Sequence, residues 1–135
     1  MRITLRNSSD VPIYEQIVSQ VVFAVAAGDV SPGELLPLSV RDLAQQLLVN
    51  PNTVARAFEE LVRCGILEPR RGLGMAVTPD APKLCRTRRQ GIVRDRLHDA
   101  LREAASAGLS AADVHELIDA EWPGVAGKNG SAKSR

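Results

Sequence analysis

Aromatic residues are scarce in this chain of 135 residues: one Trp, one Tyr and two Phe make up 3% of it. Any hydrophobic core must therefore rely on Leu, Val, Ile and Ala, for which the hydrophobic fraction of 44% suffices. The chain lacks an apolar run near the ~18–20 residues of a membrane span, and its start, MRITLRNSSD, lacks the apolar stretch of a signal peptide. We therefore expect a small soluble cytoplasmic protein with no membrane partner, built as one domain and an appendage.

Cysteine is nearly absent as well. Cys64 and Cys85 have no metal-type spacing, and such isolated cysteines are typical of reduced thiols in a cytosol. His98 and His115 have no third ligand at helical spacing, so no metal site is expected. The sequence also lacks a Ser–His–Asp set, and its stretch RRGLG lacks the Gly-Lys-Ser/Thr ending of a phosphate-binding loop. We therefore predict that the protein is not an enzyme and needs no cofactor.

Positive charge is not in large excess either, because the net charge is only +1. Residues 1–82 contain seven basic and nine acidic residues, whereas residues 83–106 contain seven basic and three acidic ones. A nucleic-acid site must therefore depend on where single charges lie. In the basic run, neighbouring cations could lower the pKa of Cys85 and make it redox-sensitive, although a thiol without a function is the simpler interpretation.

What the sequence does contain is a series of helix signals. Pro12 suits the first turn of a helix and Gly28 its end. Between them, a buried helix is predicted by apolar residues that repeat every four positions: Ile13, Ile17, Val21 and Val25. A second helix is predicted after Ser39, which can cap it, with Asp42 completing a capping box.

The stretch NPNTVARAFEELVRCG predicts a third helix with similar start signals. Asn50 caps it, Pro51 occupies its first position and Gly65 ends it. Only about three residues separate it from the preceding helix, which is the spacing of a helix–turn–helix. The following stretch, ILEPRRGLGMAVTP, predicts two short strands joined by the turn RRGLG. Residues 1–80 are therefore expected to form a winged helix–turn–helix, mainly α with a small β wing.

The rest of the chain has a different composition. Residues 81–91 contain a proline and clustered charge, which is typical of a linker, and the small polar residues 123–135 are expected to be disordered. Two helices are predicted over residues 92–122, the second with a capping box of Ser110 and Asp113. Their apolar stripes are too narrow for a core of their own, so they must pack on another surface. We expect them to form a dimerisation element through Val93, Leu97, Leu101, Ala104, Val114, Leu117 and Ile118.

Several stretches agree in order and spacing with a known pattern. They are PIYEQIVSQ, PGE followed by LP, SVRDLAQQLLVNPNTVARAFEELVRCGIL and RRGLGMAV, which together cover residues 11–78. In these stretches the chain resembles the GntR family of bacterial transcriptional regulators, specifically its short YtrA-like branch. The family usually has Leu-Pro-Ser-x-Arg, whereas LPLSVR here inserts Leu38. The resemblance implies a winged helix–turn–helix followed by a short helical dimerisation element.

On these grounds we expect a homodimeric, sequence-specific transcription regulator, a repressor that occupies a palindromic double-stranded DNA operator, with room for a small-molecule effector. The major groove of DNA accepts a helix whose N-terminal residues reach the bases, while arginines and amides bind phosphates. Arg41 in particular matches a contact position of the family. The expected DNA-binding residues are Arg41, Asn50, Pro51, Asn52, Thr53, Arg56, Arg70, Arg71 and Gly72.

Simpler interpretations remain open for these residues. Asn50 can serve as a cap only, and Arg56 can be a solvated surface residue. Arg41 can form a surface ion pair with Asp42 or Glu34. For the whole protein, the alternative is a winged-helix module that binds other proteins and not DNA, which the low net charge supports.

Overall fold

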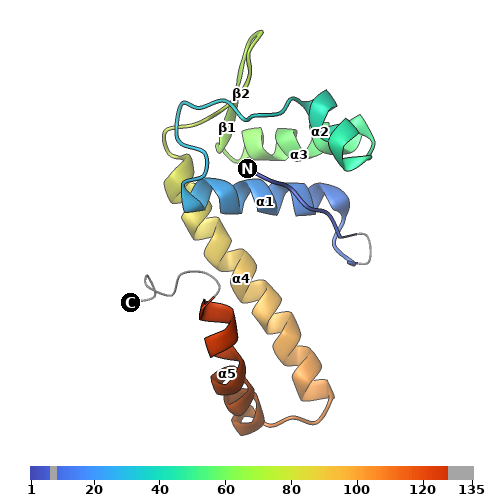
Figure 1. Ribbon diagram of the computed structural model, residues 1–135, viewed down its shortest axis with the longest axis vertical. Coiled ribbons are helices and arrows are strands. Elements are labelled where there is room, and N and C mark those ends of the chain that lie inside the picture. Colours follow the sequence, from blue (N-terminus) through green and yellow to red (C-terminus); the bar gives the residue numbers. More distant parts are fainter. Residues whose placement is uncertain (7–8, 128–135) are drawn as a thin grey trace. The chain divides into compact units, whose positions relative to one another are not determined.

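A computed structural model describes residues 1–6 and 9–127, and the chain divides into two compact units, Met1–Ile92 and a second that starts at Val93. In chain order (Figure 1), the elements are α1 (Ile13–Ala27), α2 (Val40–Leu47), α3 (Pro51–Arg63), β1 (Leu67–Arg70), β2 (Gly74–Val77), α4 (Ala81–Ser106) and α5 (Ala111–Ala126). The first unit contains three helices, a two-stranded antiparallel sheet and the start of α4. The predicted fold class, mainly α with a small β wing, is confirmed.

α1 supplies the centre of the hydrophobic core of the first unit. It begins at Ile13, so Pro12 occupies the cap position and not the predicted first turn, and it ends as predicted at Gly28, whose φ of 88° is left-handed. Ile17, Val21 and Val25 are at most 1% exposed and join residues of α2, α3 and β1 in one hydrophobic cluster. Burying such an aliphatic side chain stabilises the fold by about 1.5–3 kcal/mol.

α2 and α3 form the helix–turn–helix. Both predicted N-caps are present, because Ser39 Oγ accepts a hydrogen bond from the Asp42 N–H at 3.1 Å and Asn50 Oδ1 accepts one from the Asn52 N–H at 2.8 Å. The described residues show no return hydrogen bond from the Ser39 N–H to the Asp42 carboxylate, so the predicted capping box of α2 is only half formed. Between the two helices, Leu48 has a φ of 58° and is the one described non-glycine residue with a positive φ. α3 packs against both α1 and α2 (Figure 1).

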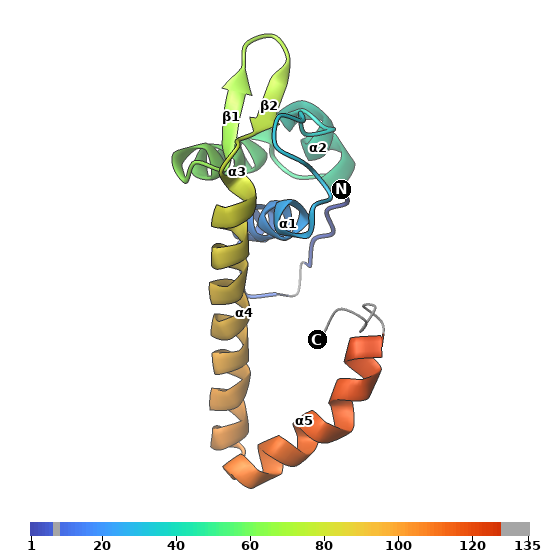
Figure 2. The same ribbon diagram turned by 90° about the vertical axis from the view of Figure 1, so that its left-hand side faces the viewer.

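β1 and β2 form the predicted wing. Leu67 lies opposite Val77 at the base of the hairpin, and Arg70 lies opposite Gly74 next to the turn. The two base residues are buried in the core cluster. The turn end of the hairpin projects away from the helices of the first unit (Figure 2).

Two glutamines of α1 hold the extended residues at the start of the chain. Gln20 accepts a hydrogen bond from the Thr4 N–H at 2.8 Å and donates one to the Thr4 carbonyl oxygen. Gln16 makes the same pair of bonds with the backbone of Arg6, at 2.8 and 3.0 Å. These bonds satisfy the buried side chain of Gln16.

The interpretation of residues 81–91 as a linker is wrong, because they form the first part of α4, and Ala81 and Cys85 are fully buried. Pro82 permits this, since a proline in the first turn of a helix has no backbone hydrogen bond to lose. α5 likewise continues beyond Pro123 to Ala126, so the expected disordered tail does not begin at residue 123. The rest of that tail, residues 128–135, lies outside the described residues.

The described part of the second unit has helix signals but no buried side chains. Ser110 Oγ accepts a hydrogen bond from the Asp113 N–H at 3.1 Å and the Asp113 carboxylate accepts one from the Ser110 N–H at 2.9 Å, so the predicted capping box is confirmed. No described residue from Val93 onward is buried. Eight of its large apolar side chains are 39% to 59% exposed, whereas Val114 is half-buried: Val93, Leu97, Leu101, Leu109, Leu117, Ile118, Trp122 and Val125 are the exposed ones. Among the described residues, no helix is long and apolar enough to cross a membrane.

Candidate nucleic-acid interface

The residues predicted to contact DNA on α3 share its outward side. Asn52 and Arg56, one turn apart, are exposed, and Thr53 is half-buried next to them. The opposite side of the helix faces the core with Val54, Ala57, Phe58 and Leu61. The short polar residues at the start of α3 therefore form one surface with the arginine of the next turn.

Asn50 and Pro51 determine where α3 begins. The side-chain oxygen of Asn50 accepts the cap hydrogen bond, and Pro51 occupies the first helical position. Both residues are exposed. The structure thus shows a capping role for Asn50, and DNA contacts of these two residues stay a prediction. A helix N-terminus favours a nearby anion, because its first amides lack helical partners.

Arg56 has a defined partner. Its guanidinium carbon lies 3.8 Å from the centroid of the Tyr14 ring, in the first turn of α1. No sequence signal predicts this contact, because neither helical nor strand periodicity relates residues so far apart in the chain. The interpretation of Arg56 as merely solvated is therefore incomplete.

Arg41 lies exposed in the first turn of α2. Among the ion pairs of residues 1–6 and 9–127, none joins Arg41 to Asp42 or Glu34. Glu34 instead accepts a hydrogen bond from the Ser31 N–H at 2.6 Å. Because a cation opposes the dipole at a helix N-terminus, this position suits an arginine best when an anion is nearby.

The turn of the wing carries the predicted basic residues. Arg71 and Gly72 are exposed between the strands, and Gly72 has a φ of 75°, which favours glycine. Arg70 Nη2 lies 3.4 Å from Glu68 Oε2, with side chains 43% and 46% exposed. Such an exposed pair contributes little to stability, so Arg70 can exchange this partner for another anion.

The acidic residue Glu60, on the flank of α3, is neutralised locally. It is hydrogen-bonded to Arg63, and its second oxygen lies 3.6 Å from Arg88 Nη2. The hydrogen bond from Arg63 is the main cause that lowers the pKa of Glu60. Arg88 also donates a hydrogen bond to Cys64 Sγ at 3.0 Å, so the basic run of α4 reaches the end of α3.

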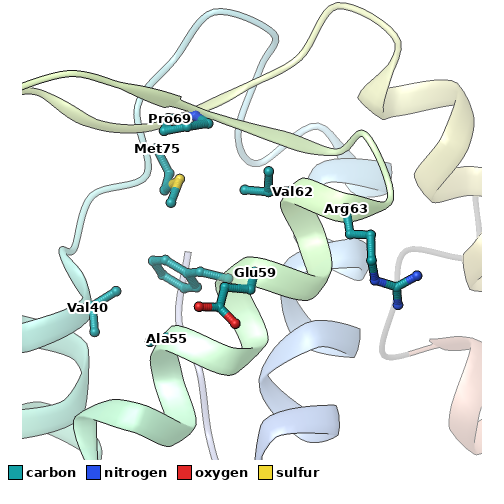
Figure 3. A pocket seen from close by; sticks show the side chains of 8 residues that line it. Val40, Ala55, Glu59, Val62, Arg63, Pro69 and Met75 are labelled. Atoms are coloured by element: carbon teal, nitrogen blue, oxygen red, sulfur yellow. The ribbon is translucent and has the colours of Figure 1, made fainter.

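An apolar cavity of about 430 Å³ lies between α2, α3 and the wing (Figure 3). Glu59 and Arg63 of α3 contribute its charged groups. The apolar lining comes from all three elements: Val40, Ala55, Phe58, Val62, Pro69 and Met75. On its wing side, α3 therefore borders an apolar recess and not a continuous polar surface.

Cys85 is fully buried. Burial raises the pKa of its thiol to about 11, and Arg88 offsets only part of this effect. A thiol with this pKa stays protonated at neutral pH and is a poor nucleophile, which favours the interpretation without a redox function. In the part of the chain that the structure describes, no group of three or more His, Cys, Asp or Glu residues could hold a metal ion.

The sequence is similar to those of known transcription regulators. Residues 13–77 match the bacterial regulatory proteins of the gntR family. The transcriptional repressor YtrA of Bacillus subtilis is 37% identical over 110 residues, which cover 82% of this chain and 84% of YtrA. The uncharacterized transcriptional regulator YhcF of the same organism is 34% identical over 110 residues, which cover 82% of this chain and 89% of YhcF.

Solved structures agree with this similarity. A GntR family transcriptional regulator from Listeria monocytogenes has a TM-score of 0.69 at 30% identity, covering 85% of this chain and 97% of the other. YtrA from Sulfolobus acidocaldarius, a GntR-family transcription factor, has a TM-score of 0.55 at 31% identity, covering 74% of this chain and 97% of the other. These relatives are transcription regulators and not enzymes. The similarity extends through the winged helix–turn–helix and beyond it, and the chain belongs to the GntR family of bacterial regulatory proteins.

Proposed function

We propose that this GntR-family regulator is a homodimeric, sequence-specific repressor that occupies a palindromic DNA operator. The observation that carries the proposal is the exposed polar side of α3, with Asn52 and Arg56, in one unit with a hairpin that has Arg70 and Arg71 at its turn. The name of the Bacillus subtilis relative, a transcriptional repressor, supports repression over activation.

The proposed contacts divide between bases and phosphates. The first turn of α3 enters the major groove, where Asn52 and Thr53 reach base edges. Arg41, at the start of α2, binds a phosphate, and Arg71 of the wing enters the adjacent minor groove. The low net charge does not oppose this mode, because affinity depends on the number of phosphates that are neutralised at the contact surface.

The proposed dimer uses the second unit. Eight large apolar side chains of this unit are at least 39% exposed, and no described residue from Val93 onward is buried. Water-exposed apolar surface of this extent is unfavourable, and a second copy of the chain can cover it. A two-fold dimer presents its two α3 helices to half-sites about one helical turn apart or a multiple of it, which is the reason for a palindrome.

Repression then follows from occupancy of the operator. An effector acts in this scheme by binding more tightly to one arrangement of the dimer's two winged helix–turn–helix units than to another. The two binding equilibria are linked. The factor by which the effector changes the affinity for the operator therefore equals the factor by which the operator changes the affinity for the effector.

A salt titration tests the proposal against the alternative of a winged-helix module that binds other proteins. The fluorescence anisotropy of a labelled random-sequence duplex is measured with the wild-type protein over a range of salt concentrations. We expect the logarithm of the binding constant to fall linearly with the logarithm of salt, with a slope of about −0.9 per neutralised phosphate. Selection from a randomised duplex pool should then enrich an inverted repeat. Absence of binding at low salt would contradict DNA binding and favour the alternative.

A further inference from the structure

We propose that Tyr14 is a positioning residue for DNA recognition, which holds the guanidinium of Arg56 ready for the operator. The inference rests on the proposed function, because it assigns a role within the same DNA-binding surface. Tyr14 itself lies outside the helix–turn–helix, in the first turn of α1.

The contact is well defined on the tyrosine side. The ring of Tyr14 is partly buried and packs against the hydrophobic core, so its orientation is fixed by α1. Its hydroxyl lies 3.5 Å from Glu15 Oε2. Arg56 is exposed and places its guanidinium carbon 3.8 Å from the ring centroid. A long flexible side chain on α3 is thus held against a fixed platform on α1.

The chemistry of the stack leaves Arg56 able to bind DNA. A guanidinium is planar, and its N–H groups point outward within that plane. A ring that stacks on one face therefore leaves the N–H edge available for a phosphate or for the bidentate acceptor pair of a guanine. Holding the side chain in one conformation also reduces the entropy that is lost on binding.

Among the described residues, no carboxylate pairs with the charge of Arg56. None of the ion pairs among the described residues includes Arg56, whereas Arg63, two turns further on α3, is paired with Glu60. A carboxylate partner would have to be displaced by a phosphate. A tyrosine ring orients the cation and leaves its full charge for the DNA.

A double-mutant cycle tests this role. The probe is the duplex of highest affinity that the wild-type protein selects from a randomised pool, and the variants are Tyr14→Leu, Tyr14→Phe, Arg56→Ala and Tyr14→Leu/Arg56→Ala. Tyr14→Leu removes the ring, and we expect it to weaken binding about two- to fivefold, the range of an exposed cation–π contact. Tyr14→Phe keeps the ring face and should bind like the wild type. In the Arg56→Ala background, Tyr14→Leu should have no further effect.

A spectroscopic readout separates positioning from a general loss of structure. The Hδ protons of Arg56 should show an upfield ring-current shift in NMR spectra of the wild type and of Tyr14→Phe, and lose it in Tyr14→Leu. The thermal midpoints of the variants identify any that bind weakly because they are partly unfolded.

The possible failures are distinguishable. If the wild type selects no duplex, the proposed function fails. The positioning role is wrong if Arg56→Ala weakens binding while Tyr14→Leu does not. It is also wrong if Tyr14→Leu weakens binding by the same factor in the wild-type and the Arg56→Ala backgrounds. In both cases DNA binding stands. Tighter binding by Tyr14→Leu would also overturn the inference, because the stack would then withhold Arg56 from DNA.

Discussion

The arginines of the winged unit differ in their partners, and the partner determines what a substitution should do. Arg63 and Arg70 are paired with carboxylates, and Arg56 stacks on a tyrosine ring. None of the ion pairs in the described part of the chain includes Arg41. Removing Arg41 should therefore affect DNA binding with little effect on folding.

We expect Arg41→Ala to weaken operator binding by about 1–3 kcal/mol, the range for a lost arginine contact. The free energy of unfolding should change by less than about 0.5 kcal/mol, because the side chain is exposed. Anisotropy titrations with the selected duplex and urea denaturation provide the two measurements. Arg94→Ala, which removes the same charge from an exposed position of the second unit, is the control. An equal loss of operator affinity in both variants would show that only the overall charge of the protein determines binding.

Cys85 should make the protein less stable in alkaline solution. In the unfolded chain its thiol ionises near the reference value of 9.0, whereas in the folded protein burial raises the pKa to about 11. Between these values the unfolded state has lost more protons than the folded state, so the free energy of unfolding falls as pH rises. In urea denaturation, the free energy of unfolding of the wild type should fall by about 2 kcal/mol between pH 8 and about pH 11, and this fall should be absent from Cys85→Ala. Parallel curves for the two proteins would contradict this assignment.

Residue roles could be predicted from the sequence where they are local. The caps by Ser39, Asn50 and Ser110 depend on residues two or three positions away, and all three are confirmed. The stack of Arg56 on Tyr14 depends on how α1 packs against α3, and that packing is not encoded in any short pattern. The same holds for the burial of Cys85.

Among the elements, the turn between α2 and α3 stores strain. Leu48 has a φ of 58° and is 90% exposed. A left-handed conformation costs a residue with a Cβ roughly 1 kcal/mol, and glycine avoids that cost. We expect Leu48→Gly to raise the free energy of unfolding by about 0.5–1 kcal/mol in urea denaturation, since no buried contact is lost. Leu48→Ala, which keeps the Cβ, is the control and should resemble the wild type; a larger gain for alanine than for glycine would refute the strain argument.

The wing should bind phosphates without base-specific contacts. Arg70→Gln/Arg71→Gln is expected to weaken binding to all duplexes similarly and to reduce the salt slope by about one to two units. Glu68→Gln releases Arg70 from its surface pair and, as the control, should not reduce the slope. Salt titrations on the selected and the random duplex measure both effects. An unchanged slope with an altered base preference would mean that the wing reads sequence.

Elements with strong periodicity and caps were predictable, whereas the boundaries expected at Pro82 and Pro123 were not. The interpretations of Pro82 as part of a linker and of Pro123 as a helix end both assumed that proline interrupts a helix. Pro82 lies in the first turn of α4, where proline is tolerated, and α5 continues for three residues beyond Pro123. The clustered charge of residues 83–89 likewise suggested a linker. On one side of that helix, however, Ala81 and Cys85 are buried in the core.

At the scale of the whole molecule, the prediction concerns association. We expect Leu97→Asp/Leu101→Asp to convert a dimer into a monomer, because it would bury unpaired charge at the proposed contact of two chains. His98→Asp/Arg102→Asp introduces carboxylates at the same spacing on α4 and should remain dimeric. Sedimentation velocity distinguishes the two results. A Leu97→Asp/Leu101→Asp variant that associates as tightly as the wild type would place the interface elsewhere in the chain.

The scarcity of aromatic residues allows association of the second unit to be followed by fluorescence without a label. The single tryptophan, Trp122, lies in α5 and is 59% exposed, and the single tyrosine, Tyr14, lies in α1. Indole emission moves to shorter wavelength when water leaves the ring, so the emission maximum on dilution would report association of the second unit. An unmodified sample can therefore report assembly through a single chromophore.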